Sequence, residues 1–192
     1  MIAILHYNAG NIQSVQNAIN RLGYNCIVTD DKALLLTADK VIFPGVGHAA
    51  SAMAHLQAKG LDTLLLSLKQ PVLGICLGLQ LMCRHTEEGN TLGLGIFDTD
   101  VTCFPPTEIV PHMGWNTLTP KPCLLFDGIG DGEHFYFVHS YYAALCNNSV
   151  ATCNYILPYS AALQKDNFYA VQFHPEKSGA AGEKLLKNFL SL

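Results

Sequence analysis

The stretch PVLGICLGLQ (residues 71–80) carries a cysteine between two glycines, where an apolar strand pattern gives way to a helical one. A chain that turns sharply from strand to helix holds its apex residue on a strained backbone, and the neighbouring positions must lack side chains. The N-terminus of the following helix favours a thiolate at the apex. The pattern Gly74-x-Cys76-x-Gly78 therefore predicts a nucleophile elbow; a small turn that only packs a cysteine is the alternative.

Apolar runs of strand length alternate with helical patterns in the first half of the chain. The expected strands are residues 2–5, 25–29, 40–45 and 71–76, and the expected helices are residues 11–23, 48–60 and the segment after the elbow. Short apolar strands separated by helices are typical of βαβ units. We therefore expect an α/β fold with a mostly parallel central sheet flanked by helices on both faces.

The second half is richer in strand patterns. They cover residues 101–104, 134–144, 150–157, 161–164 and 168–173, with turn residues between them, and a last helix is expected over 178–192. This arrangement predicts an antiparallel extension of the sheet. Because no internal repeat, linker or low-complexity tract interrupts the pattern, we expect a single domain over residues 1–192.

The composition restricts the class of function. Of the 192 residues 49% are hydrophobic and 14% charged, and the net charge of −4 gives no reason to expect nucleic acid or an anionic membrane as a partner. The seven cysteines are scattered without a C-x-x-C pair, so we expect neither disulfides nor a metal site, and no cofactor. Reduced thiols, no leader-like N-terminus and no apolar stretch of membrane length predict a cytoplasmic protein.

A cysteine nucleophile needs a base, and the base needs an orienting group. His174 follows the apolar run 168–173 and begins the sequence HPE, in which Pro175 fixes the local backbone. Glu176 could then accept from one imidazole nitrogen while the other faces Cys76. The pattern predicts a Cys-His-Glu triad; a surface turn with an incidental ion pair is the alternative.

The sequence PGVG (44–47) also follows an expected strand. Its two glycines let peptide N–H groups turn toward a developing charge, so Val46 and Leu77 are the predicted oxyanion donors. Gln80, one helical turn beyond Cys76, is close enough to help hold a substrate. An ordinary glycine turn and a solvated helix residue are the alternative interpretations.

These motifs carry a resemblance to a known family. GICLGLQ with FHPE resembles the class I (triad) glutamine amidotransferases, which implies a flavodoxin-like sheet. Further stretches are similar to the glutaminase subunits of imidazole glycerol phosphate synthase, an enzyme of histidine biosynthesis: YNAGN (7–11), PGVGH (44–48), PHMGWN (111–116) and VHSY (138–141). The match runs in order from the first expected strand to the last expected helix.

The resemblance implies that cysteine attacks the side-chain amide of glutamine, releases ammonia and forms a glutamyl thioester that water hydrolyses. It implies a catalytic triad of Cys76, His174 and Glu176 and an oxyanion hole at Val46 and Leu77. The implied glutamine pocket comprises Gly45, Gly47, Gln80, Ser140 and Tyr141.

The resemblance also implies a partner, a cyclase subunit with a (β/α)8-barrel fold, in a heterodimer. The cyclase converts the phosphoribulosyl-formimino-AICAR ribonucleotide to imidazole glycerol phosphate and AICAR ribonucleotide, using ammonia that crosses the barrel. The implied interface residues are Asn11, Met113, Trp115, Asn116 and Lys177. For Trp115, the only tryptophan, a core aromatic is the alternative. We further expect docking to align the peptides of residues 44–47 for oxyanion binding.

Other functions stay open at this point. A glutaminase for anthranilate, aminodeoxychorismate or pyridoxal phosphate synthesis shares the triad, and PHMGWN is the stretch that separates it. A stand-alone thiol hydrolase can share the elbow, but HPE and PGVG argue against it. The intact Cys76, His174 and Glu176 argue against a non-catalytic subunit. A zinc deaminase, suggested by His174-x-Glu176, requires a P-C-x-x-C stretch that this sequence lacks. Asn8 and Ser140 depart from the family pattern, where glycine and threonine are common.

Overall fold

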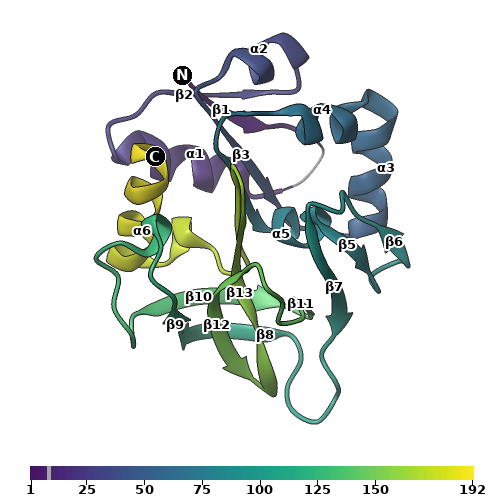
Figure 1. Ribbon diagram of the computed structural model, residues 1–192, viewed down its shortest axis with the longest axis vertical. Coiled ribbons are helices and arrows are strands. Elements are labelled where there is room, and N and C mark those ends of the chain that lie inside the picture. The colour runs from purple at the N-terminus through teal and green to yellow at the C-terminus, as the bar shows by residue number, and fades with distance from the viewer. Residues whose placement is uncertain (8–9) are drawn as a thin grey trace.

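The computed structural model describes residues 1–7 and 10–192 (Figure 1). The central sheet has a parallel part, and the motifs lie at the carboxyl ends of its strands. Its strands are β1 (Ile2–Leu5), β2 (Cys26–Thr29), β3 (Lys40–Gly45), β4 (Val72–Cys76) and β14 (Phe168–Val171). Each contains a β-branched or aliphatic run that is buried on both faces, except the edge strand β2, so the predicted parallel sheet is confirmed.

Antiparallel strands extend this sheet, as predicted. They are β13 (Leu157–Lys165), β11 (Tyr141–Ala143), β7 (Phe97–Cys103), β6 (Thr91–Leu92), β12 (Ser149–Tyr155) and β9 (Thr119–Pro120), and the short β5 (Cys83–Thr86) lies parallel to β7. Within the described residues the sheet has twelve strands, in the order β2-β1-β3-β4-β14-β13-β11-β7-β5-β6, with β12 paired to β13 and β9 to β12.

Helices cover both faces of the sheet (Figure 1). On one face lie α1 (Ile12–Arg21) and α6 (Gly179–Ser191), and on the other α2 (Lys32–Thr37), α3 (Ala49–Lys59), α4 (Leu61–Ser67) and α5 (Leu77–Met82). Two single-turn 3-10 helices complete the set, η1 (Leu124–Phe126) and η2 (Pro175–Lys177).

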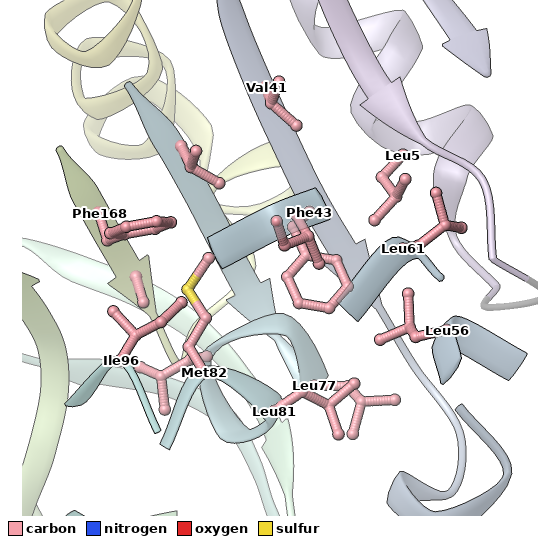
Figure 2. Close-up of a cluster of buried hydrophobic side chains, with 14 of the residues drawn as sticks. Leu5, Val41, Phe43, Leu56, Leu61, Leu77, Leu81, Met82, Ile96 and Phe168 are labelled. Carbon is pink, nitrogen blue, oxygen red and sulfur yellow. The ribbon is translucent and has the colours of Figure 1, made fainter. Parts of the chain in front are cut away.

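Alternate strand residues divide between two hydrophobic clusters, one on each face. Ala3 and Leu5 of β1 join the cluster under α3, α4 and α5, while Ile2 and Ile4 join the one under α1 and α6. Figure 2 shows the first cluster, in which Phe43 of β3 lies among leucines of these helices and Met82 of α5. The last helix buries its predicted apolar stripe: Leu185, Leu186, Phe189 and Leu190.

The region 134–144 differs from a simple pair of sheet strands. It divides at Ser140 into β10 (His134–His139) and β11, and β10 leaves the central sheet to pair with β8 (His112–Thr117) in a separate antiparallel ribbon. The helix after the elbow is also shorter than its pattern indicates, because α5 ends at Met82. Cys83 therefore begins β5 instead of continuing the helix, and it is fully buried.

The strand order decides where the motifs meet. Since β3, β4 and β14 are neighbours and parallel, the residues that follow their carboxyl ends share one edge of the sheet. Gly45 pairs with Cys76 in register, and His174 follows β14 after a short connection. Ligands bind at this edge in open α/β sheets.

Candidate active site

Cys76 is the last residue of β4 and stands immediately before α5. Its backbone has a positive φ of 54° with ψ −106°, a conformation that L residues rarely adopt, and its side chain is buried. A Cβ on Gly78 would lie 1.9 Å from the carbonyl oxygen of Phe43, and one on Gly74 would lie 2.9 Å from Met82 Sδ. Glycine is therefore required at both positions for space, and the turn has the geometry of a nucleophile elbow.

His174 lies beside this elbow and is almost fully buried. Its Nδ1 is 2.8 Å from Oε1 of Glu176, whose side chain is also buried. Because an ionised carboxylate only accepts, Nδ1 carries the proton and donates it. The other ring nitrogen, Nε2, has no hydrogen-bond partner among the described residues. Burial lowers the pKa of His174, but interactions with Cys76 and Glu176 outweigh it and raise the pKa to about 10.

Asn11 contacts Glu176, at the far end of the series Cys76, His174 and Glu176. It lies in the loop before α1, has a left-handed φ of 68°, and its Nδ2 donates to Oε1 of Glu176. Glu176 thus accepts from both Asn11 and His174 through one oxygen. Asn11, which the sequence assigns to the partner interface, is therefore also a neighbour of the buried carboxylate. Asn8 lies outside the described residues.

A cavity of about 350 Å³ opens beside Cys76. Most of the predicted site residues line it: Val46, Gly47, Cys76, Leu77, Gln80, Ser140 and Tyr141. Gly45 is not part of this lining but precedes Val46 directly. It packs against the buried hydroxyl of Tyr7, with which a Cβ at this position would collide. A larger hollow of about 580 Å³ lies near Tyr24 and Lys40 at the opposite ends of the strands, away from the elbow.

The cavity lining also contains residues that were not among the predicted site residues. Pro111, Val138 and His139 lie within the quoted stretches PHMGWN and VHSY, and Glu88 lies outside every quoted stretch. Glu88 is the acidic residue of the lining, and its Oε2 accepts from the backbone N–H of Ala49 at 2.7 Å. No sequence pattern surrounds Glu88, and it reaches the cavity only because the turn after β5 folds back over the start of α3. His139 is a buried residue at the end of β10.

His139 belongs to a buried polar cluster behind the cavity. Its Nδ1 is 2.8 Å from the carbonyl of Tyr141, while Nε2 is 3.2 Å from both His112 Nδ1 and the Tyr159 hydroxyl. Burial lowers the pKa of His139 to about 3 and that of His112 to about 4. Both imidazoles are therefore neutral near pH 7.

Comparison with known proteins identifies the family. Residues 3–192 match the model for glutamine amidotransferase class-I. The chain belongs to this family. It is 57% identical to the imidazole glycerol phosphate synthase subunit HisH of Bacteroides thetaiotaomicron and 50% identical to that of Escherichia coli, over 100% of this chain and 99% of each relative.

Solved structures agree at the level of the fold. A crystal structure described as a glutamine amidotransferase has a TM-score of 0.78 at 19% identity, covering 99% of this chain and 97% of that one. A putative GMP synthase subunit of Thermoplasma acidophilum has a TM-score of 0.75 at 17% identity, covering 99% and 92%. At these identities the likeness shows the fold of this amidotransferase and not its substrate.

The outer surface of the amidotransferase near the site is partly apolar. Met113 and Trp115 alternate along β8 and are 64% and 55% exposed, so Trp115 is not a core residue. The Trp115 ring lies 6.0 Å from that of Tyr136, and Lys177 Nζ stands 5.8 Å from the Tyr136 centroid. Asn116 is half-buried and donates to the carbonyl of Asn154 at 3.0 Å.

Within residues 1–7 and 10–192, no group of three or more His, Cys, Asp and Glu side chains is placed to hold a metal ion. Over the same part of the chain, no helix is both long and apolar enough to cross a membrane.

Proposed function

We propose that this amidotransferase is the glutaminase subunit of an imidazole glycerol phosphate synthase, acting in the cytoplasm as a single domain over residues 1–192. It hydrolyses glutamine to glutamate and ammonia, and a cyclase partner uses the ammonia in histidine biosynthesis. The observation that carries the chemistry is the buried pair His174 and Glu176 beside Cys76 on its elbow. The full-length identity of 50–58% to subunits named HisH supports the pathway.

The buried series of side chains accounts for the hydrolysis. His174 Nε2 holds the proton that it has taken from Cys76, and the resulting thiolate attacks the carboxamide carbon of glutamine. The same proton passes to the amide nitrogen as the C–N bond breaks, ammonia leaves, and a glutamyl thioester stays on the sulfur. Water then attacks the thioester with His174 as base, the C–S bond breaks, and glutamate and the thiol are restored. Glu176 holds Nδ1–H throughout, so that Nε2 faces the reacting atoms.

The cavity supplies the groups that bind glutamine and its transition state. The backbone N–H groups of Val46 and Leu77 stabilise the oxyanion that forms on the carbonyl oxygen when the thiolate attacks the carboxamide carbon. The carboxylate of Glu88 provides the negative charge that the substrate α-ammonium requires. The rest of the substrate contacts the wall formed by Gly47, Gln80, Ser140 and Tyr141, with Gly45 directly behind it, in a volume typical of small-ligand pockets.

The partner is a cyclase with a (β/α)8-barrel fold, which docks in a heterodimer on the face that carries Met113, Trp115 and Lys177. An exposed aromatic, a methionine and a cation side by side are typical of an adaptable interface. Asn11 and Asn116 border this face. Ammonia passes from the cavity into the barrel, where it reacts with the phosphoribulosyl-formimino-AICAR ribonucleotide.

The experiment that tests this function is the release of glutamate from glutamine, with and without a purified barrel cyclase and its ribonucleotide substrate. We expect strong stimulation by the cyclase and loss of all glutamate release in Cys76→Ser. The control is Cys103→Ser, which removes an exposed thiol and should keep full activity. Brisk hydrolysis that ignores the cyclase would reject the pathway, in favour of a synthase for anthranilate, aminodeoxychorismate or pyridoxal phosphate. No glutamate under any condition would reject the glutaminase itself.

A further inference from the structure

The triad leaves one neighbour of the sulfur unexplained. Gln172 lies between β14 and His174, is fully buried, and its Nε2 is 3.6 Å from Cys76 Sγ, within hydrogen-bond distance for sulfur. Its backbone N–H donates to the carbonyl of Ala161 at 2.8 Å, which fixes the main chain at this point. A fully buried primary amide is costly unless its groups are paired, so its direction toward the sulfur requires an explanation.

The neighbouring amide decides which end of Gln172 faces the sulfur. Gln80 Nε2 is 3.1 Å from the backbone carbonyl of Tyr141, which can only accept, and 3.1 Å from Oε1 of Gln172. The Gln80 nitrogen is therefore a donor to both atoms, and the oxygen of Gln172 is the acceptor. The NH2 group of Gln172 is left to point at Cys76 Sγ. The chain of donors runs from Gln80 to Gln172 to the sulfur in one direction.

This arrangement gives the sulfur a donor that is not a triad member. An N–H donor favours the charged form of a group over the neutral form, and hydrogen bonds to charged groups are stronger than those between neutral groups. Among the described residues, those that line the cavity do not include Gln172, so this amide contacts the nucleophile and not the substrate. The same donor is in place when the thioester C–S bond breaks and the electron pair returns to sulfur.

We propose that Gln172 is a further catalytic residue, which donates a hydrogen bond to the Cys76 thiolate, and that Gln80 positions the Gln172 amide for this purpose. This role adds a residue to the proposed glutaminase function, and its effect on turnover rests on that function. Gln80 is then a positioning residue as well as part of the cavity wall. Its amide nitrogen is already engaged by two acceptors of the protein.

The test measures the rate at which iodoacetamide alkylates Cys76 in the full chain, from about pH 5 to about pH 10, because only the thiolate reacts. The peptide that contains Cys76 is quantified by mass spectrometry, which separates it from the other cysteines. In Gln172→Leu we expect the midpoint of this profile to move upward by about one pH unit, so that alkylation at the acidic end slows roughly tenfold. Gln80→Leu should move it in the same direction by less, since the Gln172 amide stays but can turn.

The matched control is Thr99→Val, which removes another buried hydrogen bond, from Thr99 Oγ1 to the Ala144 carbonyl at 3.0 Å, without contact to the sulfur. Its midpoint should equal that of the wild type. An unchanged midpoint in Gln172→Leu, or an equal shift in Thr99→Val, would overturn the proposal. If Gln172→Leu does not fold, Gln172→Glu keeps the shape of the side chain. Its added negative charge should raise the midpoint further, and a fall or no change would count against the proposal.

Turnover provides a second measurement. In the complex with the cyclase, Gln172→Leu should lower kcat for glutamine roughly tenfold and leave KM nearly unchanged, because the amide lies outside the cavity lining. A change in KM alone would contradict the assignment. Alkylation needs neither glutamine nor the cyclase. A wild-type chain without glutaminase activity would therefore reject the proposed function, while the midpoints would still decide whether Gln172 donates to the sulfur.

Discussion

Gly78 and Gly47 follow the ends of the neighbouring strands β4 and β3, and they are glycines for opposite reasons. At Gly78 there is no space, because a Cβ would overlap the carbonyl oxygen of Phe43. At Gly47 there is space, with no atom within 4 Å of a Cβ, but φ is +116°, which side chains rarely adopt. The elbow is therefore held in one arrangement by packing, whereas the loop at Gly47 is free of such contacts and depends on backbone conformation alone.

The difference separates two tasks around one sulfur atom. Cys76, the proposed nucleophile, must stand in a fixed position, and close packing under Gly74 and Gly78 provides this. The peptide of Val46, the proposed oxyanion donor, can change its direction at little cost, because glycines lie on both sides of it. A partner that binds one state of the loop more tightly than another would then control the rate without moving Cys76.

The largest expected effect is at the elbow. Gly78→Ala should lower the free energy of unfolding by about 3 kcal/mol or more, because backbone must move to admit the methyl group. Urea denaturation followed by circular dichroism measures this. Gly130→Ala is the control, since Gly130 has open space and an ordinary φ, and it should change stability by less than about 1 kcal/mol. Equal losses in the two variants would remove the spatial explanation for the elbow.

At the loop the expected effect is on activity and not on folding. Gly47→Pro fixes φ near −65°, far from the observed +116°, and so blocks the observed conformation of the loop. We expect it to abolish stimulation of glutamate release by the cyclase while the affinity for the cyclase, measured by titration calorimetry, stays unchanged. Gly47→Ala should show partial loss, with a strain of about 1–3 kcal/mol. Lost affinity would show that the loop acts in docking and not in oxyanion binding.

A smaller effect is expected where the loop before α1 meets the triad. Asn11→Ala removes the donor to Glu176, so the carboxylate holds His174 less well, and kcat should fall roughly tenfold. Asn20→Ala, at the exposed end of α1, is the control and should leave kcat unchanged. If Asn11→Ala weakens cyclase binding but leaves glutamate release by the free chain intact, Asn11 belongs to the interface alone.

The smallest effect concerns the buried histidines behind the cavity. Their pKa values in the folded protein, about 4 for His112 and about 3 for His139, lie below the ordinary 6.5. As the pH falls below 6.5, the unfolded chain therefore binds more protons than the folded protein. Stability is then fully present above pH 6.5 and decreases below it, by roughly 1 kcal/mol for each histidine on reaching about pH 5.8.

The contribution of His174 to stability depends on pH in the opposite direction. Its pKa is raised, so its contribution is complete below pH 6.5 and is lost only as the pH rises toward about 10. Urea unfolding at several pH values measures both trends. In His139→Gln the decrease between pH 6.5 and about pH 5 should be shallower than in the wild type, and an identical slope would contradict the assignment.

Local patterns predicted much of this molecule, and long-range contacts account for what they missed. Strand β3 was predicted at its observed bounds, and the parallel sheet and last helix followed from periodicity, because each pattern lies within one element. The short elements α2, α4, β5 and β6 were not predicted, since they span too few residues to show a period. The division of 134–144 into β10 and β11 at Ser140 depends on pairing with the distant β8.

The same reasoning applies to the site. The elbow and HPE were predictable because their residues are close in sequence and flanked by glycine or proline. Glu88 and Gln172 were not, because a carboxylate in a turn and an amide after a strand become parts of a site only through neighbours far along the chain. The contact between Asn11 and Glu176, residues from opposite ends of the sequence, was likewise beyond any local pattern.

The ribbon of β8 and β10 connects the outer surface to His174 through a short series of contacts. Trp115 faces Tyr136 across the ribbon in register, and the carbonyl of Tyr136 accepts the backbone N–H of His174 at 2.9 Å. Ser178 Oγ closes this path, since it accepts from the backbone N–H of Tyr136 and donates to the carbonyl of His174 at 2.6 Å. The ribbon thus connects the exposed Trp115 to the backbone N–H and carbonyl of His174. A partner that displaces Trp115 would have a route to His174 through these backbone hydrogen bonds, and Trp115, Tyr136 and Ser178 do not line the cavity.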